Sequence, residues 1–154
     1  SRPARDGEAV RRRRECGACN RRFTTFEEPE KPRLFVVKRG GGREEFDREK
    51  VLTGMAHAVH KRRVTTEAVQ KAAERIELEM FDLCEPEVSS TRIGERVMEE
   101  LLQLDEVAFV RFASVYLEFE SPQEFAKVVG AIRKSKRDTK NPGVAASIVK
   151  QLVD

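Results

Sequence analysis

Two cysteines near the start of the chain have the spacing of a metal-binding motif. Cys16 and Cys19 form a C-x-x-C pair. This spacing lets two thiolates reach one Zn²⁺, and Gly17 allows the backbone to turn beneath the metal. A structural zinc ion needs four ligands. The motif therefore predicts half of a zinc site.

A redox-active dithiol is the alternative function for a C-x-x-C motif. In thioredoxin-like proteins the motif lies between an apolar strand and a helix, whereas four arginines precede it here. We therefore favour zinc. The third cysteine, Cys84, is expected to pack in the core at the end of a helix, and His57 and His60 are expected to be ordinary surface or half-buried residues.

Arginines surround this motif on both sides. Four of them, at residues 11–14, come directly before it, and Arg21 and Arg22 follow it, with no lysine among them. Guanidinium groups bind phosphates bidentately, and a cluster of them gives salt-dependent affinity for nucleic acid. A solvated surface is the simpler interpretation of a charged run. In an extended strand the first and third arginines of the run would share one face, and the second and fourth the other.

A second set of residues could bind a nucleotide. Lys38 and Arg39 end a β-prone run directly before three glycines at 40–42, where two cations can meet a triphosphate. The glycines are turn formers, because no G-x-x-x-x-G-K-[ST] motif occurs in the chain. An ordinary hairpin with exposed cations is the alternative.

Other candidates for the same site follow from their chemistry. Val36 and Phe46 are apolar and could pack near a base, while Glu44 could accept a hydrogen bond from an adenine amino group or a ribose hydroxyl. Lys50 lies in the first turn of a helix that begins at Asp47, where the helix dipole is positive.

One aromatic helix adds a further candidate. Tyr116 is the sole tyrosine, and its hydroxyl makes it the aromatic residue of this helix best suited to touch a ligand. Its aromatic neighbours Phe109, Phe112 and Phe119 are expected in the core. Arg111 is expected to form a salt bridge at the edge of the core, with a phosphate contact as the alternative.

The elements that must position these residues follow from the pattern of the chain. The first 25 residues have too few aliphatic residues to bury a core alone. Two prolines in 27–34 indicate a linker, and 34–46 read as a hairpin. After the hairpin, apolar residues at helical spacing predict a series of helices, and capping residues mark where several of them begin. The expected helices begin at Asp47, Thr65 and Ser89, and cover 107–119, 122–134 and, as a short last helix, 144–153.

Composition limits the class of protein. The 154 residues are 39% apolar, which allows one modest core, and no run approaches the roughly 18 apolar residues of a membrane span. No charged-then-apolar leader opens the chain, so we expect no secretory signal. Three cysteines are too few for a disulfide scaffold, which favours the reducing cytoplasm.

Charge is divided unevenly along the chain, although the net charge is only +3. Residues 1–25 carry eight arginines and three acidic residues, whereas residues 44–121 carry eighteen acidic and ten basic residues. Residues 122–154 are basic again, with seven basic and three acidic residues. This division predicts different partners for different parts of the chain.

Three motifs resemble those of one bacterial family. The strings DGEAVRRRRECGACNRRFTTFE, VVKRGGGREEFDREKV and LDEVAFVRFASVYLEFES, in this order, are similar to the NrdR transcriptional repressors of ribonucleotide reductase genes. The similarity runs from Ser1 to about Lys134. It implies a zinc ribbon followed by an ATP-cone domain, in which VVKRGGGREEFDREK resembles the ATP-cone signature.

The resemblance also implies a metal site. The family ribbon has two C-x-x-C motifs, and Cys16 and Cys19 match the second, so the resemblance implies that they bind Zn²⁺ in the full-length protein. The sequence begins after the position of the first motif. We therefore expect a truncated ribbon here, because two thiolates alone hold zinc poorly.

We accordingly expect an α+β fold with the following domains. Residues 1–28 would be the C-terminal part of the zinc ribbon, 29–34 a linker, and 35–134 an ATP-cone of one β-hairpin and about four to five helices. Residues 135–154 would be a basic linker and a short tail helix.

The implied function is nucleotide-controlled repression. The resemblance implies binding to double-stranded DNA boxes upstream of reductase genes, with ATP and dATP controlling the state of a homo-oligomer and its DNA affinity, in the bacterial cytoplasm at the nucleoid. The candidate DNA-binding residues are Arg2, Arg11, Arg12, Arg13, Arg14, Arg21 and Arg22. The candidate nucleotide-binding residues are Val36, Lys38, Arg39, Glu44, Phe46, Lys50 and Tyr116.

Two other classes of function compete with this one. No nucleophile–base pair stands out in the sequence, so we expect a sensor and not an enzyme. The first alternative is an ATP-cone regulatory subunit that acts directly on a reductase without binding DNA. The second is a helical scaffold whose tail, 144–153, mediates oligomers.

Overall fold

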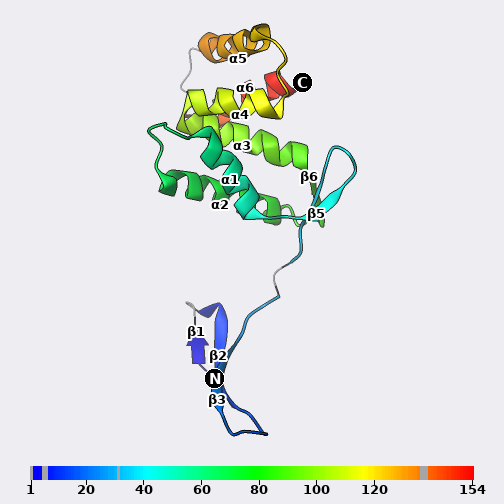
Figure 1. Ribbon diagram of the computed structural model, residues 1–154, viewed down its shortest axis with the longest axis vertical. Helices are drawn as coiled ribbons and strands as arrows, with labels where there is room; N and C mark the ends of the chain where they lie inside the picture. The colour runs from blue at the N-terminus through cyan, green and yellow to red at the C-terminus, as the bar shows by residue number, and fades with distance from the viewer. Residues whose placement is uncertain (1, 5–6, 31, 136–138) are drawn as a thin grey trace. The chain divides into compact units, whose positions relative to one another are not determined.

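The computed structural model separates the chain into two compact units, Ser1–Pro32 and Arg33–Asp154 (Figure 1). The α+β class expected from the sequence is confirmed. The structure describes residues 2–4, 7–30, 32–135 and 139–154.

The first unit is a small antiparallel sheet. Its strands are β1 (Arg2–Ala4), β2 (Ala9–Glu15) and β3 (Arg22–Glu27), in the order β1-β2-β3. Ala9 is the one apolar side chain that is fully buried among the described residues of this unit, and Phe23 and Phe26 are nearly half exposed. The sheet therefore has little core of its own, as its sequence predicts.

The second unit contains a three-stranded mixed sheet. Strand β4 (Phe35–Val37) pairs antiparallel with β5 (Arg43–Glu45), which confirms the expected hairpin. The third strand, β6 (Glu87–Ser89), pairs parallel with β4 and was not expected. Three residues are too few to show an alternating pattern, so only the fold reveals this strand.

Six helices follow or frame this sheet in the described part of the chain: five within 35–134, where four to five were expected, and the expected short helix in the tail. They are α1 (Arg48–Ala58), α2 (Thr66–Asp82), α3 (Ser90–Leu104), α4 (Glu106–Tyr116), α5 (Pro122–Lys134) and α6 (Pro142–Val153). The expected start signals are confirmed: the side chains of Asp47, Thr65 and Ser89 accept backbone N–H bonds at their helix N-termini, and Ser121 with Glu124 forms a capping box.

Two local expectations were wrong, and both concern a helix end. Helix α4 ends at Tyr116 and does not reach Phe119, because Glu118 adopts a left-handed φ of 54°. Cys84 follows α2 with the same left-handed φ and is exposed. It therefore lies outside the core where the sequence placed it.

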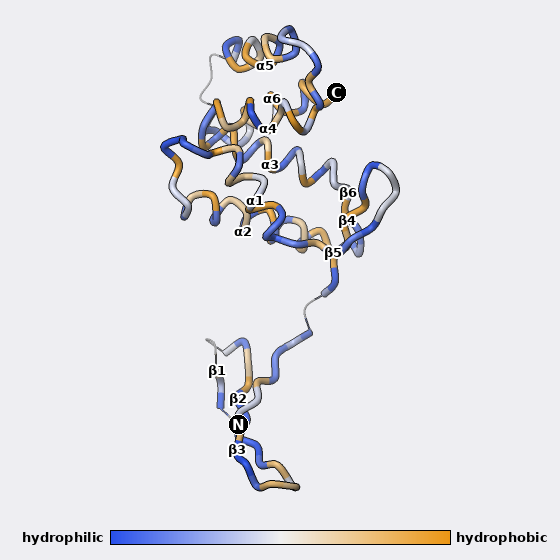
Figure 2. The backbone as a smooth tube through the Cα atoms, viewed as in Figure 1, coloured by the Kyte–Doolittle hydropathy of each residue, from blue (hydrophilic) through white to orange (hydrophobic). Residues whose placement is uncertain are grey.

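The core of the second unit is built around α3. This helix packs against α2, α4 and α6, and its Met98 and Leu101 are fully buried. Figure 2 shows apolar residues recurring along the helices of this unit. Helix α6 contributes Ala145, Ile148 and Val149 to the same core. None of the described helices is long and apolar enough to cross a membrane.

Candidate functional site

The register of β2 and β3 sorts the arginine run onto two faces. Arg12 and Arg14 share a face with Glu27: the Arg12 Nε lies 2.9 Å from Glu27 Oε1, and Arg14 Nη2 lies 3.9 Å from it. Arg14 Nε also donates to Thr25 Oγ1 at 2.9 Å. The contact with Arg12 is the main reason why the pKa of Glu27 is lowered. This face is therefore partly neutralised.

The opposite face of β2 presents the other two arginines. Arg11 and Arg13 are exposed and form no ion pair with any residue that the structure describes. Arg2 lies opposite Arg11 on β1. The alternation expected from the sequence is confirmed, and it leaves the Arg11–Arg13 face with its charge unpaired within the described residues.

The two remaining arginine candidates lie at the turn between β2 and β3. Arg22 Nε lies 3.2 Å from Glu15 Oε2, while the carbonyl of Arg21 accepts the N–H of Cys16 at 2.9 Å. All seven predicted arginines thus belong to the small sheet or to its turn.

The same turn holds the C-x-x-C motif. Hydrogen bonds from the backbone N–H groups of Ala18 and Cys19 hold the pKa of the Cys16 thiol below its usual range. That environment suits a thiolate metal ligand. Within the described residues, however, no group of three or more metal-ligating side chains exists. Cys16 and Cys19 would supply two of the four ligands that a structural zinc ion needs.

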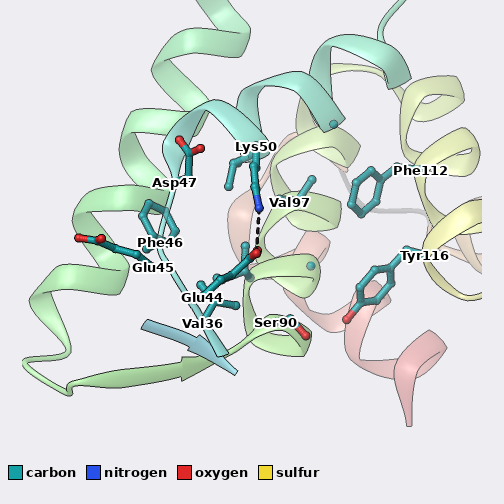
Figure 3. A pocket seen from close by; sticks show the side chains of 14 residues that line it. Val36, Glu44, Glu45, Phe46, Asp47, Lys50, Ser90, Val97, Phe112 and Tyr116 are labelled. Carbon is teal, nitrogen blue, oxygen red and sulfur yellow. Dashed lines mark hydrogen bonds and ion pairs between the residues drawn. The ribbon is translucent and has the colours of Figure 1, made fainter. Parts of the chain in front are cut away.

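A cavity of about 240 Å³ lies in the second unit, between the sheet and helices α1, α3 and α4 (Figure 3). Five of the seven residues expected to bind a nucleotide line it: Val36, Glu44, Phe46, Lys50 and Tyr116.

The other two expected residues contact the lining. Lys38 Nζ lies 3.3 Å from Glu44 Oε2, and the Arg39 guanidinium lies over the Tyr116 ring, 4.7 Å from its centroid. The fold therefore brings all seven together from β4, β5, the turn between them, the short link from β5 to α1, and helices α1 and α4.

The Glu44 carboxylate lies between two ammonium groups at the cavity. Lys50 Nζ donates to Glu44 Oε2 at 2.9 Å, on the same oxygen that Lys38 approaches. Hydrogen bonds from Lys50 and then Lys38 lower the pKa of Glu44, and the Glu44 carboxylate raises the pKa of Lys50. Figure 3 shows the Glu44–Lys50 contact at the cavity. The two lysines are thus held in place by a negative charge.

The rings of Phe112 and Tyr116 form the side of the cavity across from Glu44 and Lys50 (Figure 3). Tyr116 stacks on Phe112 at 5.8 Å between ring centroids, and its hydroxyl donates to the carbonyl of Thr91 at 3.0 Å. Phe46 packs edge-to-face on Phe81 at 5.9 Å. Phe112, which the sequence placed only in the core, lines the cavity as well.

Helices α1 and α3 contribute residues that the sequence did not single out. Ser90, Ile93, Gly94 and Val97 come from α3, and Val51 and Gly54 come from α1. A glycine inside a helix usually has a packing or functional reason, so Gly94 offered a signal that could have been used. The apolar residues carried no such signal.

Among the described residues, Arg111 contacts backbone carbonyls and not the acidic residue expected at the edge of the core. Its Nη1 donates to the carbonyl of His60 at 2.7 Å and to that of Ala58 at 3.3 Å. These carbonyls are at the C-terminal end of α1, where a cation is favourable. Arg111 therefore stabilises a helix end and forms no ion pair with an acidic residue in the described part of the chain.

Comparisons with known proteins agree with the two-part architecture. The family model described as the ATP cone domain matches residues 34–122, and the model described as the Transcriptional repressor NrdR-like, N-terminal domain matches residues 1–27.

Several curated proteins are similar over nearly their whole length, and each bears the name Transcriptional repressor NrdR. The protein from Symbiobacterium thermophilum is 54% identical over 88% of this chain and 91% of its own. The one from Paracidovorax citrulli is 51% identical over 87% of this chain and 90% of its own. The one from Thermotoga neapolitana is 48% identical over 88% and 87%, respectively.

Proposed function

The chain belongs to the NrdR family of transcriptional repressors, and from this premise we propose that it represses ribonucleotide reductase genes in response to ATP and dATP. In this proposal the unit Arg33–Asp154 binds the nucleotide and the unit Ser1–Pro32 binds double-stranded DNA. The observation that carries it is the gathering of seven residues, chosen from the sequence for a nucleotide, around one cavity.

The cavity has both cationic and apolar lining residues, as a site for a nucleoside triphosphate requires. The ammonium groups of Lys38 and Lys50 provide positive charge for the phosphates at one side. Val36, Ile93 and Tyr116 provide apolar and aromatic surface for a base, with Tyr116 across the cavity from Lys50 (Figure 3). The protein then acts as a sensor, with no residue assigned to hydrolysis.

Binding requires a change in the ion pairs of the cavity. Because both lysines contact Glu44 in this structure, a triphosphate has to compete with that carboxylate for them. The loaded site therefore differs from this one in its contacts, which is the condition for a ligand to shift a conformational equilibrium. ATP and dATP, differing at the ribose, would favour different homo-oligomeric states of unequal DNA affinity.

DNA binding is assigned to the Arg11–Arg13 face of the small sheet. These guanidiniums are exposed and unpaired within the described residues, whereas Arg12 and Arg14 are engaged by Glu27 and Thr25. Each arginine that contacts a phosphate adds about 0.9 to the slope of log affinity against log salt. The proposed partner is a pair of DNA boxes upstream of a reductase gene.

A mobility-shift titration at several salt concentrations tests the assignment. The variant Arg11→Ala/Arg13→Ala should bind a tandem-box promoter more weakly and with a salt slope lower by roughly 2 per chain. The matched control, Arg12→Ala/Arg14→Ala, removes the same charge from the other face and should retain most of the affinity. If the wild-type protein gave no salt-sensitive shift, the alternative of a regulatory subunit that acts directly on the reductase would be favoured.

A further inference from the structure

The Tyr116 ring lies directly against the backbone of α3. A Cβ built on Gly94 would lie 2.2 Å from Tyr116 Cε2, 2.5 Å from Cζ and 2.8 Å from the hydroxyl oxygen. Real Cβ atoms essentially never approach other heavy atoms within 3.0 Å. The ring can occupy its place only because residue 94 has no side chain.

Contacts from three elements fix the ring in this place. Its hydroxyl donates to the Thr91 carbonyl in the first turn of α3, and its face stacks on Phe112 of α4. The Arg39 guanidinium, in the turn between β4 and β5, lies over the ring at 4.7 Å. Figure 3 shows Tyr116 and Phe112 together on one side of the cavity, across from Lys50 and Glu44.

Gly94 differs in this respect from the glycines of α1 and α5. A Cβ at Gly54 would meet Phe112 Cε2 at 3.8 Å, which is an ordinary contact, and a Cβ at Gly130 would meet nothing within 4 Å. Glycine is among the poorest helix formers, so its presence inside α3 calls for a local reason. The Tyr116 ring supplies that reason.

We propose that Gly94 is a positioning residue for the nucleotide. By admitting the Tyr116 ring it sets the aromatic wall of the cavity and holds Arg39 beside it. The proposal rests on the proposed function of this cavity as a nucleotide site. A side chain at position 94 would push the ring outward or into the cavity, and either movement would break the Thr91 hydrogen bond and alter the space for the base.

The position of the ring can be tested without any nucleotide. The chain has one tyrosine and no tryptophan, so tyrosine fluorescence and its quenching by acrylamide report on Tyr116 alone. In Gly94→Ala the fluorescence and quenching should change, whereas Gly130→Ala, a matched glycine-to-alanine change in open space, should leave both as in wild type. An unchanged signal in a folded Gly94→Ala protein would overturn the proposal.

Calorimetric titration with ATP tests the consequence for binding. We expect Gly94→Ala to weaken ATP binding at least tenfold and Gly130→Ala to leave it within about twofold. The double variant Gly94→Ala/Tyr116→Ala should bind ATP like Tyr116→Ala alone, because Gly94 acts through the ring. This comparison needs only the double variant and Tyr116→Ala, so it decides the question even if Gly94→Ala does not fold, and weaker ATP binding by the double variant than by Tyr116→Ala would contradict the proposal.

The nucleotide site and the positioning role of Gly94 can be refuted separately. Absence of ATP binding by the wild-type protein would refute the nucleotide site itself. Normal ATP binding by wild type together with normal binding by Gly94→Ala would refute only the positioning role.

Discussion

Glu44 controls how much positive charge the cavity offers to a ligand. Its carboxylate contacts Lys50 at 2.9 Å and Lys38 at 3.3 Å, so it occupies the two ammonium groups that a triphosphate needs. An acidic residue in a site for an anion opposes binding unless it contacts the ligand itself. The sign of its effect on affinity therefore distinguishes these two roles.

We predict that Glu44→Gln binds ATP more tightly than the wild-type protein, by about threefold, since exposed ion pairs are individually weak. Calorimetry with Glu49→Gln as a control tests this, because Glu49 lies next to Lys50 outside the cavity lining and its replacement changes the net charge equally. Weaker binding by Glu44→Gln would show instead that the carboxylate accepts a hydrogen bond from the base or ribose.

The lowered pKa of Glu44 also predicts how the effect of Glu44→Gln on ATP affinity varies with pH. Lys50 and then Lys38 lower the pKa of Glu44, so the carboxylate stays ionised throughout the range above the usual glutamate value of about 4.3. Protonation, which would release the lysines, occurs only below that value. The ratio of ATP affinities between Glu44→Gln and wild type should therefore stay constant from pH 7 to pH 5. A ratio that falls to one within this range would contradict the lowered pKa.

Residue chemistry made part of the site predictable. Lys38, Arg39 and Glu44 could be chosen because charged residues beside a glycine turn suggest a ligand, and all three lie at the cavity. Ile93 and Val97 could not be chosen, because apolar residues at helical spacing look the same whether they line a cavity or fill a core. Only the packing of α3 against the sheet separates the two cases.

Among the elements, helix ends were harder to predict than helix starts. The Asp47 side chain accepts the N–H of Glu49, and the Glu124 side chain accepts the N–H of Ser121, and such local chemistry is visible in the sequence. Helix α4 ends at Tyr116 because Glu118 takes a left-handed conformation. Glutamate rarely adopts this conformation, so its position in the sequence does not predict it. Strand β6 pairs with β4, whose residues lie 52 positions earlier in the chain, and no local pattern indicates it.

Helix α6 illustrates what tertiary packing adds to a weak local signal. From the sequence it is a short helix after a basic linker, yet its Ala145, Ile148 and Val149 are buried against the same core as α3. The ATP cone match ends at residue 122, before this helix. We infer that α6 stabilises the second unit although it lies beyond the matched segment.

We predict that Ile148→Ala lowers the free energy of unfolding of the second unit by about 2–4 kcal/mol, because Ile148 is only 4% exposed. Urea denaturation followed by circular dichroism measures this change. The control Lys150→Ala, on the exposed side of the same helix, should change it by less than about 0.5 kcal/mol. Equal effects of the two variants would mean that α6 is not part of the cooperative core.

At the scale of the whole molecule, charge and binding role are divided between the two units. The arginine-rich sheet belongs to Ser1–Pro32, and the cavity belongs wholly to Arg33–Asp154. A repressor that senses a nucleotide has to couple these two sites. Coupling is a free energy shared by both ligands, so it acts equally in both directions.

This reciprocity predicts equal effects of ATP on DNA binding and of DNA on ATP binding. If saturating ATP changes the dissociation constant for promoter DNA by some factor, saturating DNA must change the dissociation constant for ATP by the same factor, which for allosteric proteins is typically about 5–150. Fluorescence anisotropy of labelled DNA and calorimetry with ATP measure the two factors independently.

Two variants separate the coupling from binding itself. Lys50→Met should weaken ATP binding and make DNA affinity insensitive to ATP, while DNA affinity without nucleotide stays as in wild type, because the arginine face is untouched. Arg11→Ala/Arg13→Ala should bind ATP as the wild-type protein does. DNA should change its dissociation constant for ATP only at higher DNA concentrations than in wild type. If DNA affinity were the same with and without ATP or dATP in the wild-type protein, both sites could exist and the proposed regulation would still be wrong.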